Sequence, residues 1–276
     1  MKLKKILAIM MALAMSTVAM TGCSNEKKDD ASKEKGAENS GAQVVDGNEV
    51  ATGEKTYDKV LKMATNAAFP PYEYKEGEEF AGIDVEIAQA IAEELGCELE
   101  IVDMEFDSII ASVQNGETDF GMAGMTVTDE RKEEVDFTFS YATGVQVVIV
   151  TEDSAIASID DLEGKKIGVQ LGTTGDIYAT DDYGAENVTQ YGKGADAIIA
   201  LKGGDVDAVI IDNEPAKAFV EQNGGLKILD TEYAIEDYAI AVKKGNPILS
   251  DINQALEKLT MDETIDNIIA KYISAE

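Results

Sequence analysis

Three short motifs carry side chains that could bind a small charged molecule. Arg131 lies in TDERKEEV, and its planar guanidinium can hold a carboxylate through two parallel hydrogen bonds, although a lone arginine more often forms a surface ion pair. Asp212 follows the apolar segment AVII, where a carboxylate is costly unless it caps the next helix or meets a cation. Thr173 and Thr174, in GVQLGTTG, precede a predicted helix whose N-terminal N–H groups favour an anion. This motif lacks the lysine and the loop length of a P-loop, which excludes a nucleotide site.

The residue types that dominate catalysis and metal binding are scarce. The chain contains no histidine, which excludes Ser-His-Asp and Cys-His arrangements and removes the commonest metal ligand. Besides Cys23 the only cysteine is Cys97, at the end of a predicted helix, and we expect it to pack in the core. The net charge of −31 repels nucleic acids and anionic lipids. The absence of histidine narrows the catalytic mechanisms that are possible without excluding an enzyme. We expect a binding protein with no metal, no cofactor and no nucleic-acid partner.

These side chains must be positioned by alternating strands and helices. VLKMAT predicts a strand, IDVEIAQAIAEELG an amphipathic helix, and ELEIVDM the next strand. We expect Asp84 to cap this helix and Gly96 to end it, and Asp107 and Thr128 to cap the two helices that follow. Repeated units of this kind predict an α/β fold with helices packed on sheets.

A second series of such units begins with VQVVIVT, and the closing segment supplies one strand and two helices, too little for a domain of its own. We expect that segment to rejoin the first lobe. Lobe 1 would then comprise residues 56–142 and 239–276, and lobe 2 residues 143–238. Two crossings, near 141–144 and 236–238, would form a hinge that opens and closes a cleft for a small ligand.

The N-terminus has the features of an export signal. Lysines at positions 2, 4 and 5 precede an apolar stretch that is too short to span a membrane, and the stretch ends in Met20-Thr21-Gly22-Cys23. The ending resembles the bacterial lipobox, so we expect residues 1–22 to be a lipoprotein signal peptide and Cys23 to be lipidated. Ordinary secretion with an unmodified cysteine is the alternative. Residues 23–55 are polar and charged and predict a disordered linker that tethers residues 56–276, the head, to the outer face of the cell membrane.

Five motifs in the head closely resemble those of the polar amino-acid solute-binding proteins of ABC importers: ATNAAFPPYEY, AGIDVEIAQAIAEELG, AGMTVTDERKEEVDF, GVQLGTTG and DAVIIDN. Their order and spacing agree with that family over nearly all of residues 57–276. The resemblance implies a two-lobed periplasmic-binding-protein-like fold of type II, with two hinge crossings. It also implies that the lobes close on an α-amino acid, which is then delivered to a membrane permease.

The resemblance also implies how the two ends of the amino acid are held. The α-carboxylate would be bound by groups from both lobes, namely Arg131, Thr126, Thr173 and Thr174. The α-ammonium would meet the Gly124 carbonyl and the Asp212 carboxylate. Because Arg131 and Asp212 belong to different predicted lobes, a zwitterion would bridge them and favour closure.

For the ligand side chain, the resemblance places Phe69 and Phe106 on either side, where a planar guanidinium or amide would stack. Asn66 and Glu73 lie beside them and could meet a polar side-chain end, and Gln170 can donate or accept. Relatives that bind basic ligands carry Asp at the position of Asn66, so the departure leaves both an arginine-like and a glutamine-like ligand open.

Two other functions are compatible with the same fold. A cyclohexadienyl-dehydratase-like enzyme would act on a ring substrate, but Asp212 argues against it because such a substrate need not carry an ammonium group. A ligand-sensing ectodomain would bind in the same way and signal through a partner chain.

Overall fold

The computed structural model describes residues 59–230 and 232–273, which belong to one compact unit. The predicted signal peptide (1–22), the lipidation residue Cys23 and the predicted linker (23–55) lie outside the described residues. Within the described part of the chain, no helix is long and apolar enough to cross a membrane.

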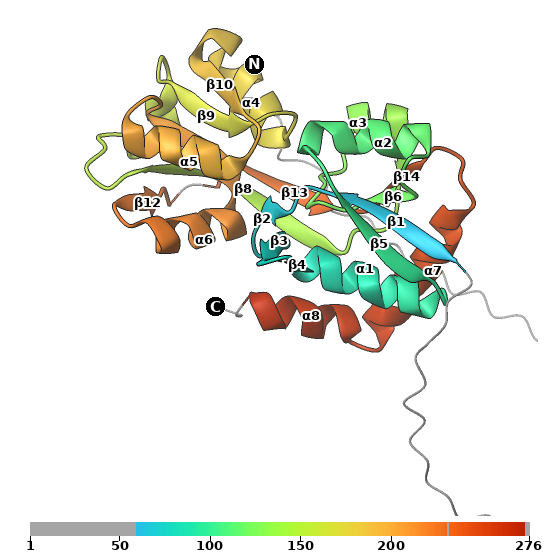
Figure 1. Ribbon diagram of the computed structural model, residues 1–276. Helices are drawn as coiled ribbons and strands as arrows, with labels where there is room; N and C mark the ends of the chain where they lie inside the picture. The colour runs from blue at the N-terminus through green and yellow to red at the C-terminus, as the bar shows by residue number, and fades with distance from the viewer. Residues whose placement is uncertain (1–58, 231, 274–276) are drawn as a thin grey trace, which may run out of the picture. The chain divides into compact units, whose positions relative to one another are not determined.

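The first lobe is built on a five-stranded sheet (Figure 1). Across the sheet its strands are β5 (Glu98–Asp103), β1 (Val60–Thr65), β6 (Phe120–Gly121), β14 (Ala241–Lys243) and β7 (Val135–Phe137). β1 runs parallel to β5 and β6, whereas β14 runs antiparallel to β6 and β7. The chain thus returns after the second lobe to complete the sheet that it began.

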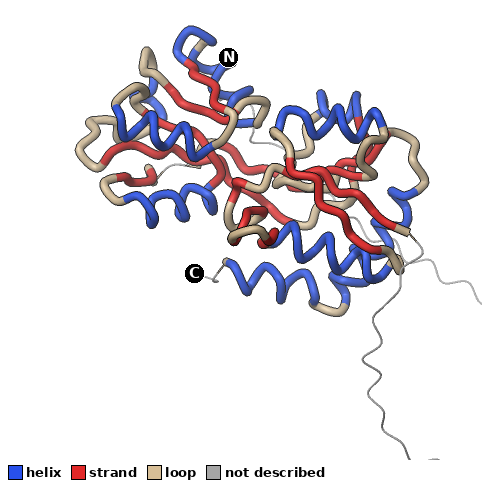
Figure 2. Tube along the Cα trace, in the orientation of Figure 1, coloured by secondary structure: helices blue, strands red, loops and turns tan. Residues whose placement is uncertain are grey.

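Helices cover both faces of this sheet (Figures 1 and 2). One face packs against α1 (Ile83–Glu94), α7 (Ile248–Met261) and α8 (Thr264–Tyr272). The other packs against α2 (Ile109–Asn115), with α3 (Asp129–Glu134) beside it. Cys97 is a free, buried cysteine in the first of these cores, as expected from its position after α1.

Two of the predicted helix caps are wrong and one is confirmed. Helix α1 begins after Gly82, which has φ +122 and leaves no room for a side chain, since a Cβ would lie 2.2 Å from the Tyr72 carbonyl oxygen. Asp84 is therefore inside the helix, and its side chain turns into the protein. Asp107 lies in a 3₁₀ turn, Phe106–Ser108, that precedes α2.

Thr128 caps α3 as predicted, because its hydroxyl accepts a hydrogen bond from the Arg131 N–H at 3.1 Å. Gly96, just past the end of α1, has φ +66, the left-handed backbone that glycine adopts without strain.

The second lobe is built on a six-stranded sheet. Its strands are β10 (Val188–Tyr191), β9 (Ile167–Gln170), β11 (Ala208–Asp212), β8 (Ala142–Thr151) and β12 (Leu226–Ile228), with β13 (Ala234–Tyr238) also paired to β8. The long strand β8 is buried on both faces. Val147 and Ile149 pack with α5 (Gly194–Gly203) and α6 (Asn213–Asn223), whereas Val148 and Val150 pack with α4 (Thr174–Tyr183).

The chain passes between the two sheets at the start of β8 and at the end of β13. These strands are antiparallel neighbours, and Tyr141 N donates to the Tyr238 carbonyl at 3.0 Å where they leave the first lobe. A three-stranded sheet made of β2 (Ala68–Phe69), β3 (Glu73–Glu76) and β4 (Glu79–Ala81) lies beside this junction (Figure 1). The loops around the junction carry most of the polar residues that the motifs predict to bind a ligand.

Candidate ligand-binding site

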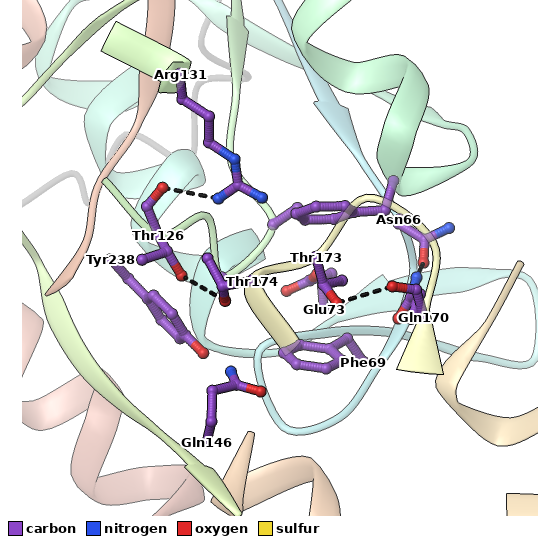
Figure 3. Close-up of a pocket in the computed structure, with 13 residues that line it drawn as sticks. Asn66, Phe69, Glu73, Thr126, Arg131, Gln146, Gln170, Thr173, Thr174 and Tyr238 are labelled. Carbon is purple, nitrogen blue, oxygen red and sulfur yellow. Dashed lines mark hydrogen bonds between the residues drawn. The ribbon is translucent and has the colours of Figure 1, made fainter. Parts of the chain in front are cut away.

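A small cavity lies where residues of the two lobes meet (Figure 3). Its volume of about 20 Å³ is close to that needed for a single water molecule. An amino acid could therefore enter only if the lobes separate or the lining side chains move. The lining residues are Asn66, Phe69, Glu73, Phe106, Ala123, Gly124, Thr126, Arg131, Gln146, Gln170, Thr173, Thr174 and Tyr238.

Arg131 brings a buried positive charge to this cavity. The helix α3 positions it, and only 7% of its surface is exposed. Nη1 donates to the Thr126 carbonyl at 2.7 Å, and Nη2 crosses to the second lobe and donates to the Gly172 carbonyl at 3.0 Å. The guanidinium forms no ion pair with a carboxylate among the described residues, and burial lowers its pKa, an effect that Glu236 opposes. A cation without a carboxylate partner can receive an anionic ligand group.

A cluster of hydroxyl and carboxyl groups joins the lobes beside Arg131. Thr126, after β6, and Thr174, at the start of α4, both donate to Glu236 Oε2, at 3.0 and 2.9 Å. Gln146 Nε2, on β8, donates to the same oxygen at 3.0 Å. Glu236 Oε1 has no hydrogen-bond partner among the described residues. One buried carboxylate oxygen therefore orients three side chains that line the cavity, two threonines and one glutamine, and links both lobes.

The opposite end of the cavity is polar and also joins the lobes. Gln170 Nε2, at the end of β9, donates to Asn66 Oδ1 at 2.9 Å, and Asn66 Nδ2 donates to the Met104 carbonyl at 2.7 Å.

Thr173 caps α4, since its hydroxyl accepts from Asp176 N at 3.3 Å. The N-terminus of α4 thus opens beside the predicted carboxylate position, where its N–H groups favour negative charge.

Two aromatic rings complete the walls. Arg131 lies over the Phe106 ring, with 5.4 Å from its central guanidinium carbon to the ring centroid. Phe69 stacks on Tyr72, with ring centroids 6.0 Å apart. Gly124 has φ +52 and sits so close to Phe69 that a Cβ would lie 3.2 Å from its ring, so this turn needs a residue without a side chain.

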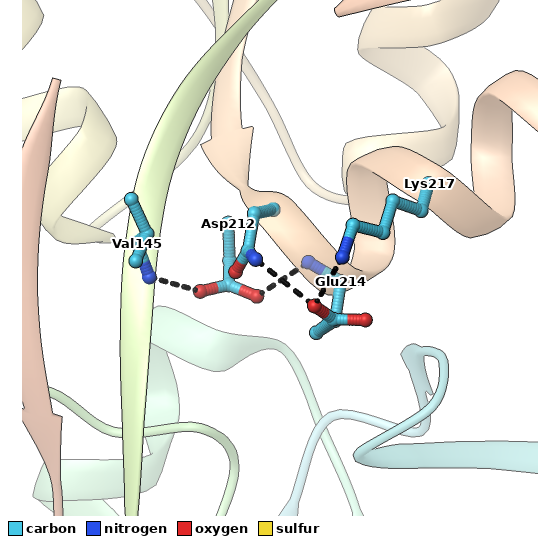
Figure 4. A network of polar contacts seen from close by, with 5 residues as sticks. Val145, Asp212, Glu214 and Lys217 are labelled. Carbon is cyan, nitrogen blue, oxygen red and sulfur yellow. Dashed lines mark hydrogen bonds and ion pairs between the residues drawn. The ribbon is translucent and has the colours of Figure 1, made fainter. Parts of the chain in front are cut away.

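Asp212 is the one residue predicted to bind the ligand that does not line the cavity. It is fully buried at the N-terminus of α6, where Oδ1 caps the helix by accepting from Glu214 N at 3.1 Å (Figure 4). Oδ2 accepts from Val145 N at 3.0 Å and from the Tyr238 hydroxyl at 2.7 Å. Burial raises the pKa of Asp212 from 3.8 to about 7. The carboxylate reaches the cavity only through Tyr238, which lines it.

Glu73 and Asp84 form a second buried acidic feature on the first lobe. Glu73 lines the cavity and is 1% exposed, while Asp84 Oδ2 accepts from Gly124 N at 2.8 Å and from the Tyr141 hydroxyl at 2.9 Å. Burial raises the pKa of both groups, that of Glu73 well above its ordinary value and that of Asp84 to about 6.

The motif-based prediction did not include Gln146, Tyr238 and Glu236. Alternation along strand β13 gave no usable signal for Glu236, because residues two apart share a face and the apolar Ile235 would be expected to point inward. In the structure Ile235 is 68% exposed, whereas Glu236 and Tyr238 are buried. Among the described residues no group of acidic, cysteine or histidine side chains is arranged to hold a metal ion.

The two sheets, the strands that cross between them and the polar cavity at their junction define a two-lobed solute-binding protein of type II. Residues 61–275 match the bacterial extracellular solute-binding proteins, family 3, and the chain belongs to that family.

Relatives and solved structures agree with this assignment. The arginine-binding extracellular protein ArtP of Bacillus subtilis is 33% identical over 82% of this chain and 90% of its own length. The ABC transporter glutamine-binding protein GlnH of the same organism is 28% identical over 99% of both chains. An ancestral arginine-binding protein bound to glutamine superposes with a TM-score of 0.75 at 40% identity, covering 80% of this chain and all of the other. The ancestral amino acid-binding protein AncCDT-1, a precursor of cyclohexadienyl dehydratase, gives a TM-score of 0.72 at 32% identity, covering 77% and 95%.

Proposed function

We propose that this protein is the extracytoplasmic binding component of an amino-acid ABC importer. It captures a polar L-amino acid by closure of its lobes and delivers it to a membrane permease. The observation that carries the proposal is the buried guanidinium of Arg131, which lines a cavity shared by both lobes without an ion-pair partner among the described carboxylates. A buried cation in that position favours a ligand that brings its own carboxylate.

In the proposed complex the ligand α-carboxylate is held by Arg131, by the Thr126 hydroxyl or N–H, and by the N-terminus of α4 at Thr173 and Thr174. The Thr126 and Thr174 hydroxyls now donate to Glu236, so they would have to rotate or share their hydrogen bonds when a carboxylate enters. The cavity of about 20 Å³ supports a mechanism in which the lobes open before the ligand binds.

The α-ammonium is proposed to meet the Gly124 carbonyl and Asp212. Asp212 belongs to the second lobe and Gly124 to the first, so one ammonium group would join them. For this pairing, the Tyr238 hydroxyl must either release its hydrogen bond to Asp212 Oδ2 or share that oxygen with the ligand ammonium. A positive ligand group there would also favour the ionised form of Asp212, which burial otherwise disfavours.

Phe69 and Phe106 are proposed to enclose the ligand side chain, with Asn66, Glu73 and Gln170 at its polar end. This composition suits a planar guanidinium or carboxamide, because such a group stacks on rings and also forms hydrogen bonds at its edge. Arginine and glutamine are the ligands to test first, and both occur in the names of similar proteins.

A thermal-shift screen of the twenty amino acids tests the proposal. A ligand at 100 times its dissociation constant stabilises the folded state by about 2.7 kcal/mol, which moves the melting temperature by several degrees. We expect one or a few polar amino acids to do so. No shift with any of them would contradict the proposed function.

The location at the membrane is part of the same proposal. A lipid on Cys23 would hold the protein at the outer face of the cell membrane, with residues 23–55 as a tether between the lipid and the head. Several acyl chains are needed for stable anchoring, since a single chain binds only marginally.

A dehydratase-like activity is the second candidate, because the structure is similar to a binding protein described as the precursor of cyclohexadienyl dehydratase. Incubation with prephenate or arogenate distinguishes the two: turnover would support an enzyme, and its absence together with amino-acid binding would support transport.

A further inference from the structure

Two buried carboxyl groups meet at one wall of the cavity. Glu73, on β3, lines the cavity, and Asp84, on α1, is fully buried. Asp84 N donates to the Tyr72 carbonyl at 2.8 Å, which brings Asp84 next to Glu73 in the structure, and Asp84 raises the pKa of Glu73. Glu73 Oε2 and Asp84 Oδ1 receive no hydrogen bond from any donor among the described residues. Two carboxyl groups that face each other can form a hydrogen bond only if one of them carries a proton.

The surroundings of the pair favour keeping that proton. Burial is the main cause that raises the pKa of Glu73, and the neighbouring acids Asp84 and Asp212 raise it further. The phenols of Tyr72 and Tyr141 face the same pair and remain neutral, because burial and the acidic groups raise their pKa values. A second negative charge in this place would be buried without a positive partner, which is unfavourable.

Cations on the neighbouring elements are engaged elsewhere or lie at the far end of the ligand site. Arg131 is the only cation among the described residues that line the cavity. The other charged side chains on β3, β4 and α1 are exposed or paired away from Glu73: Lys75 with Asp103, Glu86 with Lys271, Glu94 with Lys258, and the exposed Glu76, Glu79 and Glu93.

We infer that Glu73 and Asp84 share one proton while the site is empty, and that a cationic ligand side chain expels this proton to solvent when it binds. The inference rests on the proposed function and deepens it, because it assigns different protonation states of Glu73 to complexes with cationic and with neutral ligand side chains. Glu73 loses one proton and the ligand brings one positive charge, so the net charge of the site is unchanged. Both carboxyls belong to the first lobe, so the pair does not require the lobes to be closed.

Ligands of different charge should therefore use Glu73 in different forms. A guanidinium donates hydrogen bonds and gains a charge-assisted pair with ionised Glu73. A carboxamide is neutral, and its oxygen can accept a hydrogen bond from protonated Glu73, so the proton stays. Arginine affinity should thus rise with pH while glutamine affinity changes little.

Titration calorimetry with the purified protein tests this inference. Binding heats are measured near neutral pH in two buffers of different ionisation enthalpy, with arginine and then with glutamine. We expect arginine binding to release about one proton per protein and to weaken about tenfold per pH unit on acidification, and glutamine binding to release almost none. Arginine binding without proton release would overturn the shared proton and leave the proposed function standing. Failure of both arginine and glutamine to bind would overturn this inference, whereas the proposed function fails only if none of the twenty amino acids binds.

Two variants assign the proton to this pair. Glu73→Gln removes the titrating group, so proton release should vanish and arginine should bind at least tenfold more weakly, while glutamine binding stays within a few-fold. Asp84→Asn keeps an acceptor for Gly124 N and places an N–H donor opposite Glu73. Because this donor favours the carboxylate form, Glu73 should be ionised before the ligand binds. Arginine should still bind, but without proton release.

Glu79→Gln, an exposed acid on the adjacent strand β4, is the matched control and should behave like the wild type. Wild-type proton release that survives in both Glu73→Gln and Asp84→Asn would overturn the inference. If Asp84→Asn does not fold, the result for Glu73→Gln decides alone.

Discussion

Arg131→Ala removes the group on which the proposed binding mode depends. The guanidinium has five N–H donors, and its two described side-chain bonds go to the carbonyls of Thr126 and Gly172. Enough donors remain for a bidentate grip on a ligand carboxylate. Loss of two charge-assisted bonds at about 1.5 to 3 kcal/mol each weakens binding by about 3 to 6 kcal/mol, or roughly 150-fold to 20,000-fold.

The same substitution should affect stability less than binding. The cap of α3 uses the backbone N–H of residue 131 and survives, but the Gly172 carbonyl loses its partner from the other lobe. We expect a loss of about 1 to 3 kcal/mol in the free energy of unfolding. Calorimetric titration with the best ligand from the screen, together with thermal unfolding of the free protein, separates the two effects.

The neighbouring Lys132 provides the matched control for this experiment. It pairs with Asp129 on the exposed side of α3, at 3.3 Å, and does not line the cavity. Lys132→Ala should leave affinity unchanged within about twofold, because exposed pairs contribute little. An Arg131→Ala protein that folds and binds its amino acid with wild-type affinity would refute the carboxylate site.

Three further substitutions test other parts of the structure. Cys23→Ser should release the protein from the membrane into the medium, as followed by fractionation, and continued retention would argue against a lipid anchor. Gly124→Ala should destabilise the protein by about 1 to 3 kcal/mol and weaken ligand binding, since its Cβ would lie 3.2 Å from the Phe69 ring. Gly77→Ala is the control: Gly77 has a similar φ of +68 but no neighbour within 4 Å of an added Cβ, so binding should stay intact. Because burial raises the pKa of Asp212 from 3.8 to about 7, the folded state holds a proton that the unfolded chain loses, and stability falls as pH rises through this window. Asp212→Asn should flatten that fall in a series of thermal unfolding curves, and an unchanged slope would count against the buried, protonated form.

Much of the fold could be predicted from the sequence because its signals are local. The apolar positions of α1 repeat with helical spacing, and Ile87, Ala88, Ile91 and Ala92 are indeed buried on one face. Thr128 directly precedes α3 and caps it.

Asp84 shows where such local reasoning fails. An aspartate near the start of a helix commonly caps it, but here Gly82 begins the helix and the carboxylate is drawn inward by Gly124 N and Tyr141, which lie 40 and 57 residues away in the sequence. Contacts at that separation leave no local pattern.

The cavity likewise contains residues that the sequence predicts and residues that it does not. Residues within the recognisable motifs, such as Arg131 and Thr174, line it. Glu236 and Gln146 lie on the crossing strands outside those motifs, and only the pairing of β8 with β13 brings them together. Asp212 follows an apolar strand as the motif indicates, but the Tyr238 hydroxyl, from a strand 26 residues later, accounts for its place one layer behind the cavity.

A crystal structure of the protein with its bound amino acid tests the central claim most directly. We predict that the ligand carboxylate contacts the Arg131 guanidinium and that its ammonium contacts Asp212, with the lobes closed around both. A ligand bound elsewhere, or one whose carboxylate does not contact Arg131 or whose ammonium does not contact Asp212, would contradict the account.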